Sequence, residues 1–188
     1  MKVTILNESG FKQAIEGLSL SYNTPFGKAL QASHKLYNKD GGHNKFLESM
    51  QVWIKITAPR YFWSEFDTYR IGVTKQSEST IHTIMKNELT QENFQEPIYL
   101  DVLTKLNRVI KLYKETPNID IKNSLFVEIK NNLPEGFLQT RIVSMNYKTL
   151  RNIIIQRKNH KLKEWRHFCT VVLSTAQYPE YLKDLMEV

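Results

Sequence analysis

The sequence predicts an α+β domain in which helices outweigh strands. Two short segments, residues 2–6 and 51–57, alternate apolar and polar side chains as half-buried strands do. Longer segments, of which residues 98–115 are the clearest, repeat apolar side chains at helical spacing. Strands and helices are mixed along the chain with short connections, which is typical of the α+β class. No repeat, low-complexity segment or linker interrupts the 188 residues, so residues 1–188 are expected to form a single domain.

The N-terminal part of the chain is expected to combine strands and helices. In order, the predicted elements are a strand at 2–6, helices at 11–18 and 26–37, a short helix at 43–49 and a strand at 51–57. The pair Gly41-Gly42 breaks the chain before the short helix. In the second strand, Val52, Ile54 and Ile56 alternate with more polar neighbours, which predicts one buried face.

The middle of the chain is expected to be helical apart from one loop. Pro59 is tolerated in a first helical turn and starts a predicted helix over 59–70. Gly72 and the polar run at 74–80 predict a loop or irregular segment. Helices are then predicted at 81–88, 98–115 and 120–131, the second of them with an apolar stripe of Leu100, Leu103, Leu106 and Ile110.

The C-terminal part carries a concentration of positive charge. A strand is predicted at 137–145, followed by a basic helix, a helix at 161–176 and a short tail helix. Between Lys148 and Arg166 the chain has seven Lys or Arg residues and one acid, Glu164, against a net charge of +7 for the whole chain. Because Arg157 falls in the apolar stripe of the basic helix, it is expected to face the core and to meet an anionic ligand or a buried acid.

Composition limits the other classes of function. The pI of about 9.4 favours anionic partners such as nucleotides or nucleic acid. A single cysteine, Cys169, excludes an internal disulfide, fits a reducing cytoplasm and is expected to be a buried structural thiol. Apolar runs fall short of the ~18 residues of a membrane span, and no signal-peptide pattern begins the chain, so no membrane partner is expected. The histidines are scattered and predict no metal site.

Several candidate residues have a plain structural interpretation beside the functional one. Asn146 precedes the basic helix and is equally suited to cap it. Lys148 and Asn152 lie on one flank of that helix and suit either a ligand or the solvent. Residues 75–80 are expected to be a solvated loop. The aromatic side chains of 59–70 suit stacking on single-stranded nucleic acid, but packing inside the protein is the preferred interpretation.

The spacing of these residues resembles a known family. The series Asn146-x-Lys148-x3-Asn152-x4-Arg157, followed by His160 and Glu164, is similar to a segment of the flavin-dependent thymidylate synthases, with Lys148 in the position of an arginine. The segment GGHNKFLES, with His43 and Glu48, resembles a second family motif. The resemblance covers roughly residues 40–170 and implies an antiparallel sheet flanked by helices.

The family's signature R-H-R-x-x-S-x-N-E-x-S-x-R-Y aligns with residues 69–82 but is largely rewritten. Only Ser79 is identical, while Gln76 is a mild change. Tyr69 and Ile71 replace two arginines, and Arg70 replaces the histidine between them. In the family these residues help to hold flavin, so the departure concerns flavin binding above all, and it is compatible with a phage origin.

The resemblance implies a C5 methylation, or a related C5 modification, of dUMP with FAD, methylene-tetrahydrofolate and NADPH. It implies catalytic and substrate roles for Arg157 and Ser79 and substrate binding by Gln76. The residues implied to hold cofactor are Asn146, Lys148, Asn152, His43, Glu48 and Arg70. A homotetramer with active sites between subunits is implied as well. Two alternatives stay open: a nucleotide-binding protein of this fold without flavin chemistry, and a nucleic-acid-binding protein that uses the basic helix.

Overall fold

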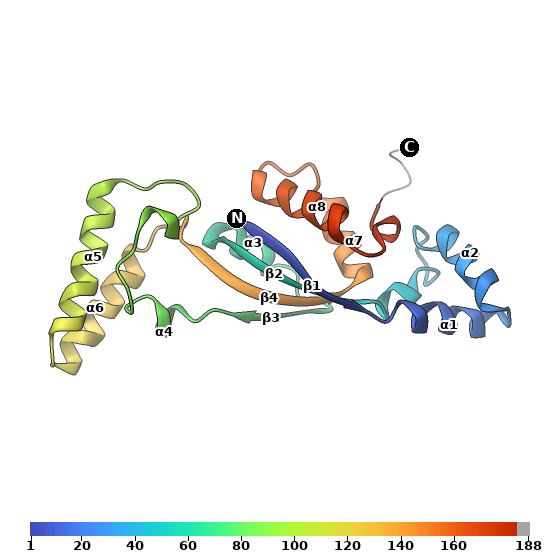
Figure 1. Cartoon of the computed structure of the whole chain (residues 1–188), viewed down its shortest axis with the longest axis horizontal. Coiled ribbons are helices and arrows are strands. Elements are labelled where there is room, and N and C mark those ends of the chain that lie inside the picture. Colours follow the sequence, from blue (N-terminus) through green and yellow to red (C-terminus); the bar gives the residue numbers. More distant parts are fainter. Residues whose placement is uncertain (184–188) are drawn as a thin grey trace. The chain divides into compact units, whose positions relative to one another are not determined.

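The computed structural model describes residues 1–183 and contains one four-stranded antiparallel sheet (Figure 1). The strands are β1 (Lys2–Ser9), β2 (Gln51–Pro59), β3 (Val73–Ser77) and β4 (Leu138–Asn146), in the order β1-β2-β4-β3. The predicted α+β class and the antiparallel sheet are therefore confirmed. By contacts the chain divides into two compact units, and β2 and β4 pass from one unit into the other.

The first unit consists of Met1 and residues 57–67 and 77–141. Its helices are α3 (Arg60–Phe66), α4 (Thr80–Thr83), η2 (Gln91–Asn93), α5 (Leu100–Glu115) and α6 (Ile119–Asn132). The long helices α5 and α6 form a hairpin, and Asn118 caps α6 by accepting from the amides of Asp120 and Ile121. In the predicted stripe of α5, Leu103, Leu106 and Ile110 are buried, whereas Leu100 is 73% exposed.

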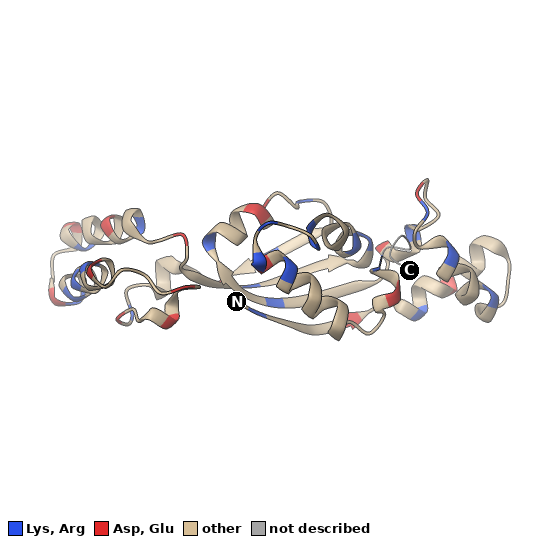
Figure 2. Ribbon diagram, turned by 90° about the horizontal axis from the view of Figure 1, so that it is seen from above, with Lys and Arg blue, Asp and Glu red and all other residues tan. Residues whose placement is uncertain are grey.

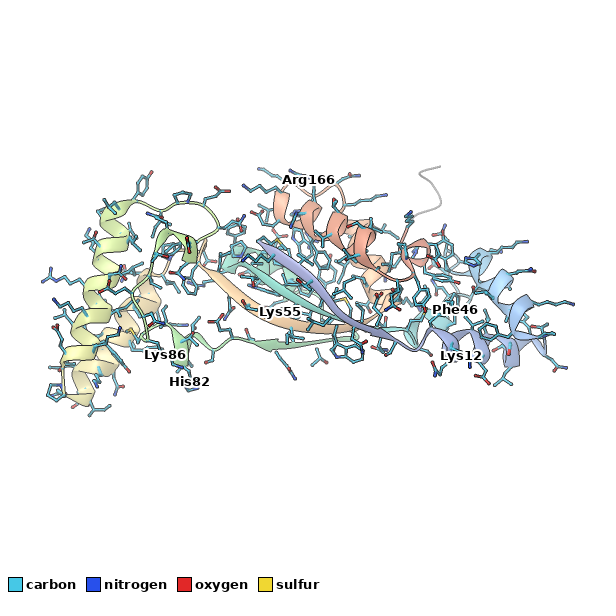
Figure 3. The ribbon with its side chains drawn as sticks, in the orientation of Figure 1. Lys12, Phe46, Lys55, His82, Lys86 and Arg166 are labelled. Atoms are coloured by element: carbon cyan, nitrogen blue, oxygen red, sulfur yellow. The ribbon has the colours of Figure 1, made fainter. Side chains whose placement is uncertain are left out.

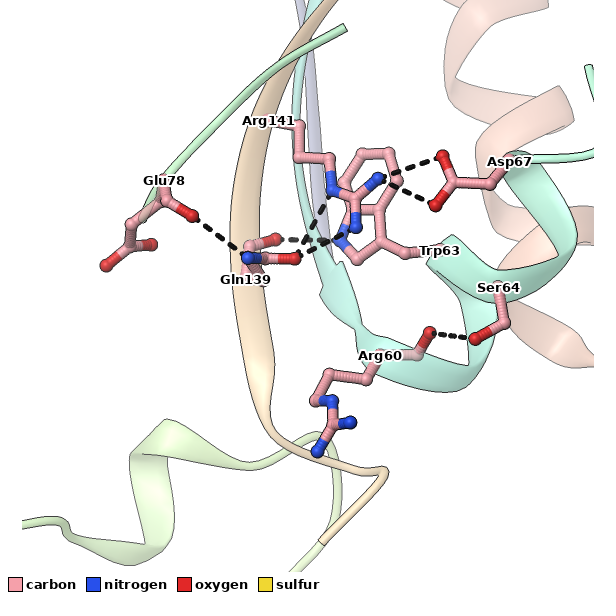
Figure 4. A network of polar contacts seen from close by, with 7 residues as sticks. All are labelled: Arg60, Trp63, Ser64, Asp67, Glu78, Gln139 and Arg141. Carbon is pink, nitrogen blue, oxygen red and sulfur yellow. Dashed lines mark hydrogen bonds and ion pairs between the residues drawn. The ribbon is translucent and has the colours of Figure 1, made fainter. Parts of the chain in front are cut away.

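The aromatic side chains of α3 pack inside the first unit, as the preferred interpretation predicts. Phe62, Trp63 and Phe66 are buried. The indole Nε1 of Trp63 donates to the carbonyl of Gln139 (2.9 Å), and the Arg141 guanidinium lies 4.4 Å from the Trp63 ring centre (Figure 4). These three rings are therefore used for packing and not for stacking on nucleic acid.

The second unit consists of residues 2–56, 68–76 and 142–183. Its helices are α1 (Phe11–Tyr22), α2 (Phe26–Leu36), η1 (Lys45–Glu48), α7 (Tyr147–Arg157), α8 (Lys163–Thr175) and η3 (Pro179–Tyr181). Helix α8 packs against β1, and η1 packs against α7. Gly10 joins β1 to α1 with φ +87°, and a Cβ there would lie 2.2 Å from the carbonyl oxygen of Ser49, so only glycine fits.

One aromatic cluster closes the α1–α2 end of the second unit. Phe46, labelled in Figure 3, is buried and contacts the Tyr181 ring edge-on at 5.8 Å. The Tyr181 hydroxyl is 2.7 Å from the hydroxyl of Ser33, which is also buried. Burial raises the pKa of Tyr181 above its usual value. This cluster therefore belongs to the core of the unit.

Three predicted elements are wrong or incomplete. Residues 73–77 form the edge strand β3 and not a loop, because backbone pairing with β4 stabilises a segment whose polar side chains suit an exposed edge. The helix predicted at 59–70 ends at Phe66, after which Asp67 binds Arg141 at 3.0 Å. The helix predicted at 81–88 is reduced to α4, and Ile84 and Met85 follow in a buried turn.

Within residues 1–183, none of the helices combines the length and the apolar character that crossing a membrane requires. The predicted tail helix falls partly on η3 and otherwise lies outside the described residues. Cys169 is buried, as expected of a structural thiol.

Candidate functional site

A hollow in the second unit gathers most of the predicted site residues. It lies between one face of α7 and the segment 68–71, and its volume is about 470 Å³, within the range of small-ligand sites. Its lining residues are Glu48, Thr68, Tyr69, Arg70, Ile71, Asn146, Lys148, Thr149, Asn152 and Gln156. Five of the six residues implied to hold cofactor therefore line one hollow, although they come from three separate stretches of the chain.

Asn146 fixes the start of α7 at the edge of the hollow. Its Oδ1 accepts from the amide of Thr149 (2.9 Å), so the predicted N-cap is confirmed. Its Nδ2 has no hydrogen-bond partner within residues 1–183. Gly72 approaches this cap closely: a Cβ at Gly72, where φ is +69°, would lie 3.1 Å from that Nδ2. The glycine thereby lets segment 68–72 lie against the start of the helix.

Lys148 and Glu48, which both line the hollow, form an ion pair with each other. The Lys148 Nζ lies 2.7 Å from Glu48 Oε1, and both side chains are partly exposed. An ion pair this accessible to solvent contributes at most about 1 kcal/mol to folding. The pair therefore positions a cation and a carboxylate at the rim more than it stabilises the fold.

Two amide side chains follow each other along the side of α7 that lines the hollow. Asn152 and Gln156 are one helical turn apart, so their side chains share a face. Asn152 is exposed to the hollow and has no hydrogen-bond partner in the part of the chain that the structure describes. The Oε1 of Gln156 accepts from the Tyr69 hydroxyl (2.9 Å). This face therefore offers hydrogen-bonding groups of both kinds to a ligand.

Arg157 lies behind the hollow and does not line it. Its Nε donates to the Tyr69 hydroxyl (2.8 Å), and its guanidinium carbon lies 4.8 Å from the centre of the Trp165 ring and 5.5 Å from that of Tyr69. The expectation that Arg157 faces the core is met only in part, because the side chain packs against the buried Trp165 ring but is itself half-buried. Because Arg157 is the last residue of α7, the apolar stripe is not continued beyond it.

The buried arginine of this helix is Arg151, which the sequence pattern did not indicate. It is only 7% exposed, its Nη2 donates to Asn38 Oδ1, and its guanidinium carbon lies 5.6 Å from the centre of the Tyr37 ring. Its Nε is buried without a hydrogen-bond partner among residues 1–183. Residues 37–38, which are far from α7 in sequence, bury this side of the helix. Helical periodicity reports only the residues of the helix itself, so it does not predict this contact.

Of the other predicted residues, Arg70 lies at the hollow, whereas His43, Gln76 and Ser79 lie elsewhere. Arg70 lines the hollow and is exposed. His43 lines a different hollow of the second unit, beside α1. Gln76 is exposed on β3. Ser79 belongs to the first unit, where it precedes α4 and its carbonyl accepts from Thr83 Oγ1 (2.9 Å). Their functional roles stay predictions.

Besides Tyr181, two buried groups of the second unit have raised pKa values. Burial raises the pKa of the Cys169 thiol to about 12, which leaves it protonated and unreactive at neutral pH. Burial, and then the hydrogen bond that its hydroxyl donates to Glu8, raises the pKa of Tyr147 far above its usual value. Both groups therefore stay neutral at physiological pH.

Tyr69 and Gln156 are the lining residues that sequence reasoning missed as site residues. Gln156 was open to detection, because it follows Asn152 by four residues on a helix whose other ligand-facing positions were identified. Tyr69 aligns with a family arginine, but its contact with Gln156 joins residues 87 apart in sequence, and no local pattern indicates that contact.

Comparisons with known proteins agree with this architecture. A structure of the flavin-dependent thymidylate synthase ThyX from Helicobacter pylori, complexed with FAD and dUMP, is 18% identical with a TM-score of 0.75, covering 98% of this chain and 99% of that one. A second structure of Helicobacter pylori ThyX with FAD and dUMP is 17% identical with a TM-score of 0.78, and both chains are covered completely. No curated protein matches the sequence.

The family follows from the sequence itself. Residues 10–179 match the family described as "Thymidylate synthase complementing protein". The resemblance to the flavin-dependent thymidylate synthases is thereby confirmed, although the signature at 69–82 is rewritten. Because the match spans most of the chain and includes residues of both compact units, this protein belongs to the thymidylate synthase complementing protein family.

Proposed function

We propose that this protein is a flavin-dependent thymidylate synthase-type enzyme that methylates C5 of dUMP, or modifies it in a related way. The observation that carries the proposal is the hollow beside α7, where Asn146, Lys148 and Asn152 meet Arg70 and Glu48. These residues match the positions that hold flavin and nucleotide in the family. The neighbours of known structure contain FAD and dUMP, which supports the choice of ligands.

The residues of the hollow suit an anionic ligand with a planar polar ring. Arg70 and Lys148 supply positive charge at the rim, where phosphate oxygens would meet guanidinium and ammonium donors. The Nδ2 of Asn146, whose Oδ1 caps α7, and the amide of Asn152 would supply hydrogen bonds for ring oxygens and nitrogens. A volume of about 470 Å³ suits one mononucleotide or one flavin ring.

Bound reduced flavin would supply hydride, with methylene-tetrahydrofolate as the one-carbon donor and NADPH as the source of electrons. The family resemblance assigns the stabilisation of negative charge on the uracil, as C5 becomes nucleophilic, to Arg157, which does not itself line the hollow but contacts the lining residue Tyr69. The rings of Trp165 and Tyr69 hold its guanidinium, and the Tyr69 hydroxyl fixes its Nε. Preorganising a cation in this way lowers the cost of reorganisation during the reaction.

The remaining assignments complete the proposal. Ser79 and Gln76 would contact the nucleotide, and His43 would shape the flavin and folate region. A cytoplasmic homotetramer, with active sites formed between subunits, would bring further residues to each hollow. These assignments follow from the family resemblance.

The test begins with the colour of the freshly purified protein and with titrations of FAD and dUMP. A functional enzyme should show the visible absorption of flavin after FAD is added, and should release tritium from dUMP labelled at C5 in a flavin-dependent manner. A protein that stays colourless, binds no FAD and leaves C5 of dUMP intact would contradict the proposal. Sedimentation of the same sample measures the oligomeric state.

One observation favours a second candidate, a nucleotide-binding protein without flavin chemistry. Tyr69 and Ile71 replace the family's arginines; Tyr69 is bonded to Arg157 and Gln156, and Ile71 is 90% exposed. Separate titrations distinguish the candidates, because binding of dUMP without binding of FAD supports this second function.

Nucleic-acid binding is the weakest of the alternatives. Lys and Arg are interspersed with Asp and Glu along α5 and α6 (Figure 2). Arg166 lies on the outer side of α8 (Figure 3), where its Nη1 donates to the carbonyl of Lys161 (2.9 Å) and closes the turn before that helix. A polyanion-binding protein would show an affinity that falls steeply with salt concentration.

A further inference from the structure

The α7 face of the hollow holds one further hydrogen-bonding residue, Gln156. Gln156 is exposed and lies one turn beyond Asn152. Of its two amide atoms, Oε1 accepts from the Tyr69 hydroxyl (2.9 Å). Its Nε2 has no hydrogen-bond partner within residues 1–183, and Gln156 is one of the residues that line the hollow. Gln156 therefore presents a pair of N–H donors to whatever enters.

The orientation of this amide is set by its neighbours. The Nε of Arg157 can only donate, and it donates to the Tyr69 oxygen at 2.8 Å. The Tyr69 hydroxyl in turn donates to Oε1 of Gln156 (2.9 Å), so this oxygen is the Gln156 amide atom that faces Tyr69. The chain Arg157–Tyr69–Gln156 thus turns the Nε2 of Gln156 away from Tyr69.

Asn152 adds the complementary groups beside this donor. Because neither its Oδ1 nor its Nδ2 has a partner in the described part of the chain, it offers one acceptor and one further donor. The same helix face therefore offers two amide donors and one amide acceptor within one turn. A ligand edge with two acceptors and one donor complements them, and a cyclic imide, C(=O)–NH–C(=O), has these groups.

We propose that Gln156, oriented by Tyr69 and acting with Asn152, is a specificity-determining residue that reads the imide edge of the bound ring. Uracil and the flavin ring both carry this edge. The inference rests on the proposed function, because it states which part of its ligands the hollow recognises. It adds a residue outside the family motif, since Gln156 lies between the matching positions 152 and 157.

The experiment compares ligand pairs that differ only at the imide. The first pair is dUMP and dCMP, because cytosine has an amine and an unprotonated nitrogen where uracil has a carbonyl and an N–H. The second pair is FMN and its imide N-methylated analogue. Dissociation constants are measured for the wild type, Gln156→Leu, Tyr69→Phe and Gln31→Leu. Gln31 is an exposed glutamine of α2 outside the hollow and serves as the matched control.

The wild type should prefer the imide-bearing member of at least one pair by about tenfold, and the pair that discriminates identifies the ring. Gln156→Leu should weaken the binding of the imide-bearing ligand by about fivefold to tenfold and leave the binding of the other ligand unchanged. Tyr69→Phe should have a smaller effect in the same direction, because the amide loses its orientation. Gln31→Leu should change nothing.

Three results would overturn the inference: a wild type that does not discriminate within either pair, equal weakening of both members by Gln156→Leu, or no binding of any probe. Only the last also removes the proposed function. If tritium is released from dUMP but Gln156→Leu binds every ligand as the wild type does, the inference about Gln156 is wrong and the proposed function stands. Discrimination by the imide without any turnover would keep the inference and contradict the enzyme.

Discussion

The contact between Arg157 and Tyr69 can be measured by a double-mutant cycle. Arg157→Met keeps an unbranched side chain against Trp165 but removes the guanidinium, and Tyr69→Phe removes only the hydroxyl. Each single variant also loses other interactions, and the cycle cancels them. What remains is the 2.8 Å hydrogen bond from Nε to the hydroxyl.

The expected coupling follows from the geometry. A hydrogen bond from a charged donor contributes about 1.5–3 kcal/mol, and partial exposure of both side chains reduces this to about 1 kcal/mol. Urea unfolding followed by circular dichroism, on the wild type, both single variants and the double variant, gives the four free energies. A coupling below about 0.3 kcal/mol, the usual limit of additivity, would refute the assignment of Tyr69 as the residue that fixes Arg157.

Three further predictions concern single positions. Gly10→Ala should lower the free energy of unfolding by about 2 kcal/mol or more in urea titrations, because φ is +87° and the new Cβ would lie 2.2 Å from the Ser49 carbonyl oxygen; an unchanged midpoint would contradict the described turn. Cys169 should resist a thiol reagent at neutral pH until the protein unfolds. Since its pKa is raised from 9.0 to about 12 by burial, its contribution to stability should be complete below pH 9 and be lost as the pH rises towards 12; rapid labelling of the folded protein would argue against this. Lys148→Met should weaken nucleotide binding in calorimetry yet change folding stability by less than about 1 kcal/mol, with Glu48→Gln as the partner control, and a large loss of stability would show that the ion pair is structural.

Local patterns in the sequence predicted those elements whose own residues carry the signal. The alternation of Val52, Ile54 and Ile56 predicted β2, and all three side chains are fully buried. The polar composition of 73–77 concealed β3, because pairing with β4 is a long-range interaction that side-chain propensity does not report.

In the candidate site, too, local spacing predicted some residues, whereas long-range contacts brought in others. Spacing along α7 placed Lys148 and Asn152 on one face, and both line the hollow together with the cap residue Asn146. The contact of Tyr69 with that helix depends on how the chain returns after α3, which no spacing rule reveals. Arg151 was missed for a similar reason, since its cover comes from Asn38.

Asn146 is the last residue of β4 and also the cap of α7, so strand and helix meet with no connecting residue. The following amide, that of Tyr147, donates to the carbonyl of Met50 (2.9 Å) and fastens the joint to the chain just before β2. A single-residue insertion at this point would rotate every later side chain of the helix by about 100° and turn the ligand-facing residues elsewhere. The joint therefore defines where the chain cannot change in length, whereas exposed loops of the kind at 39–43 are where insertions are ordinarily tolerated.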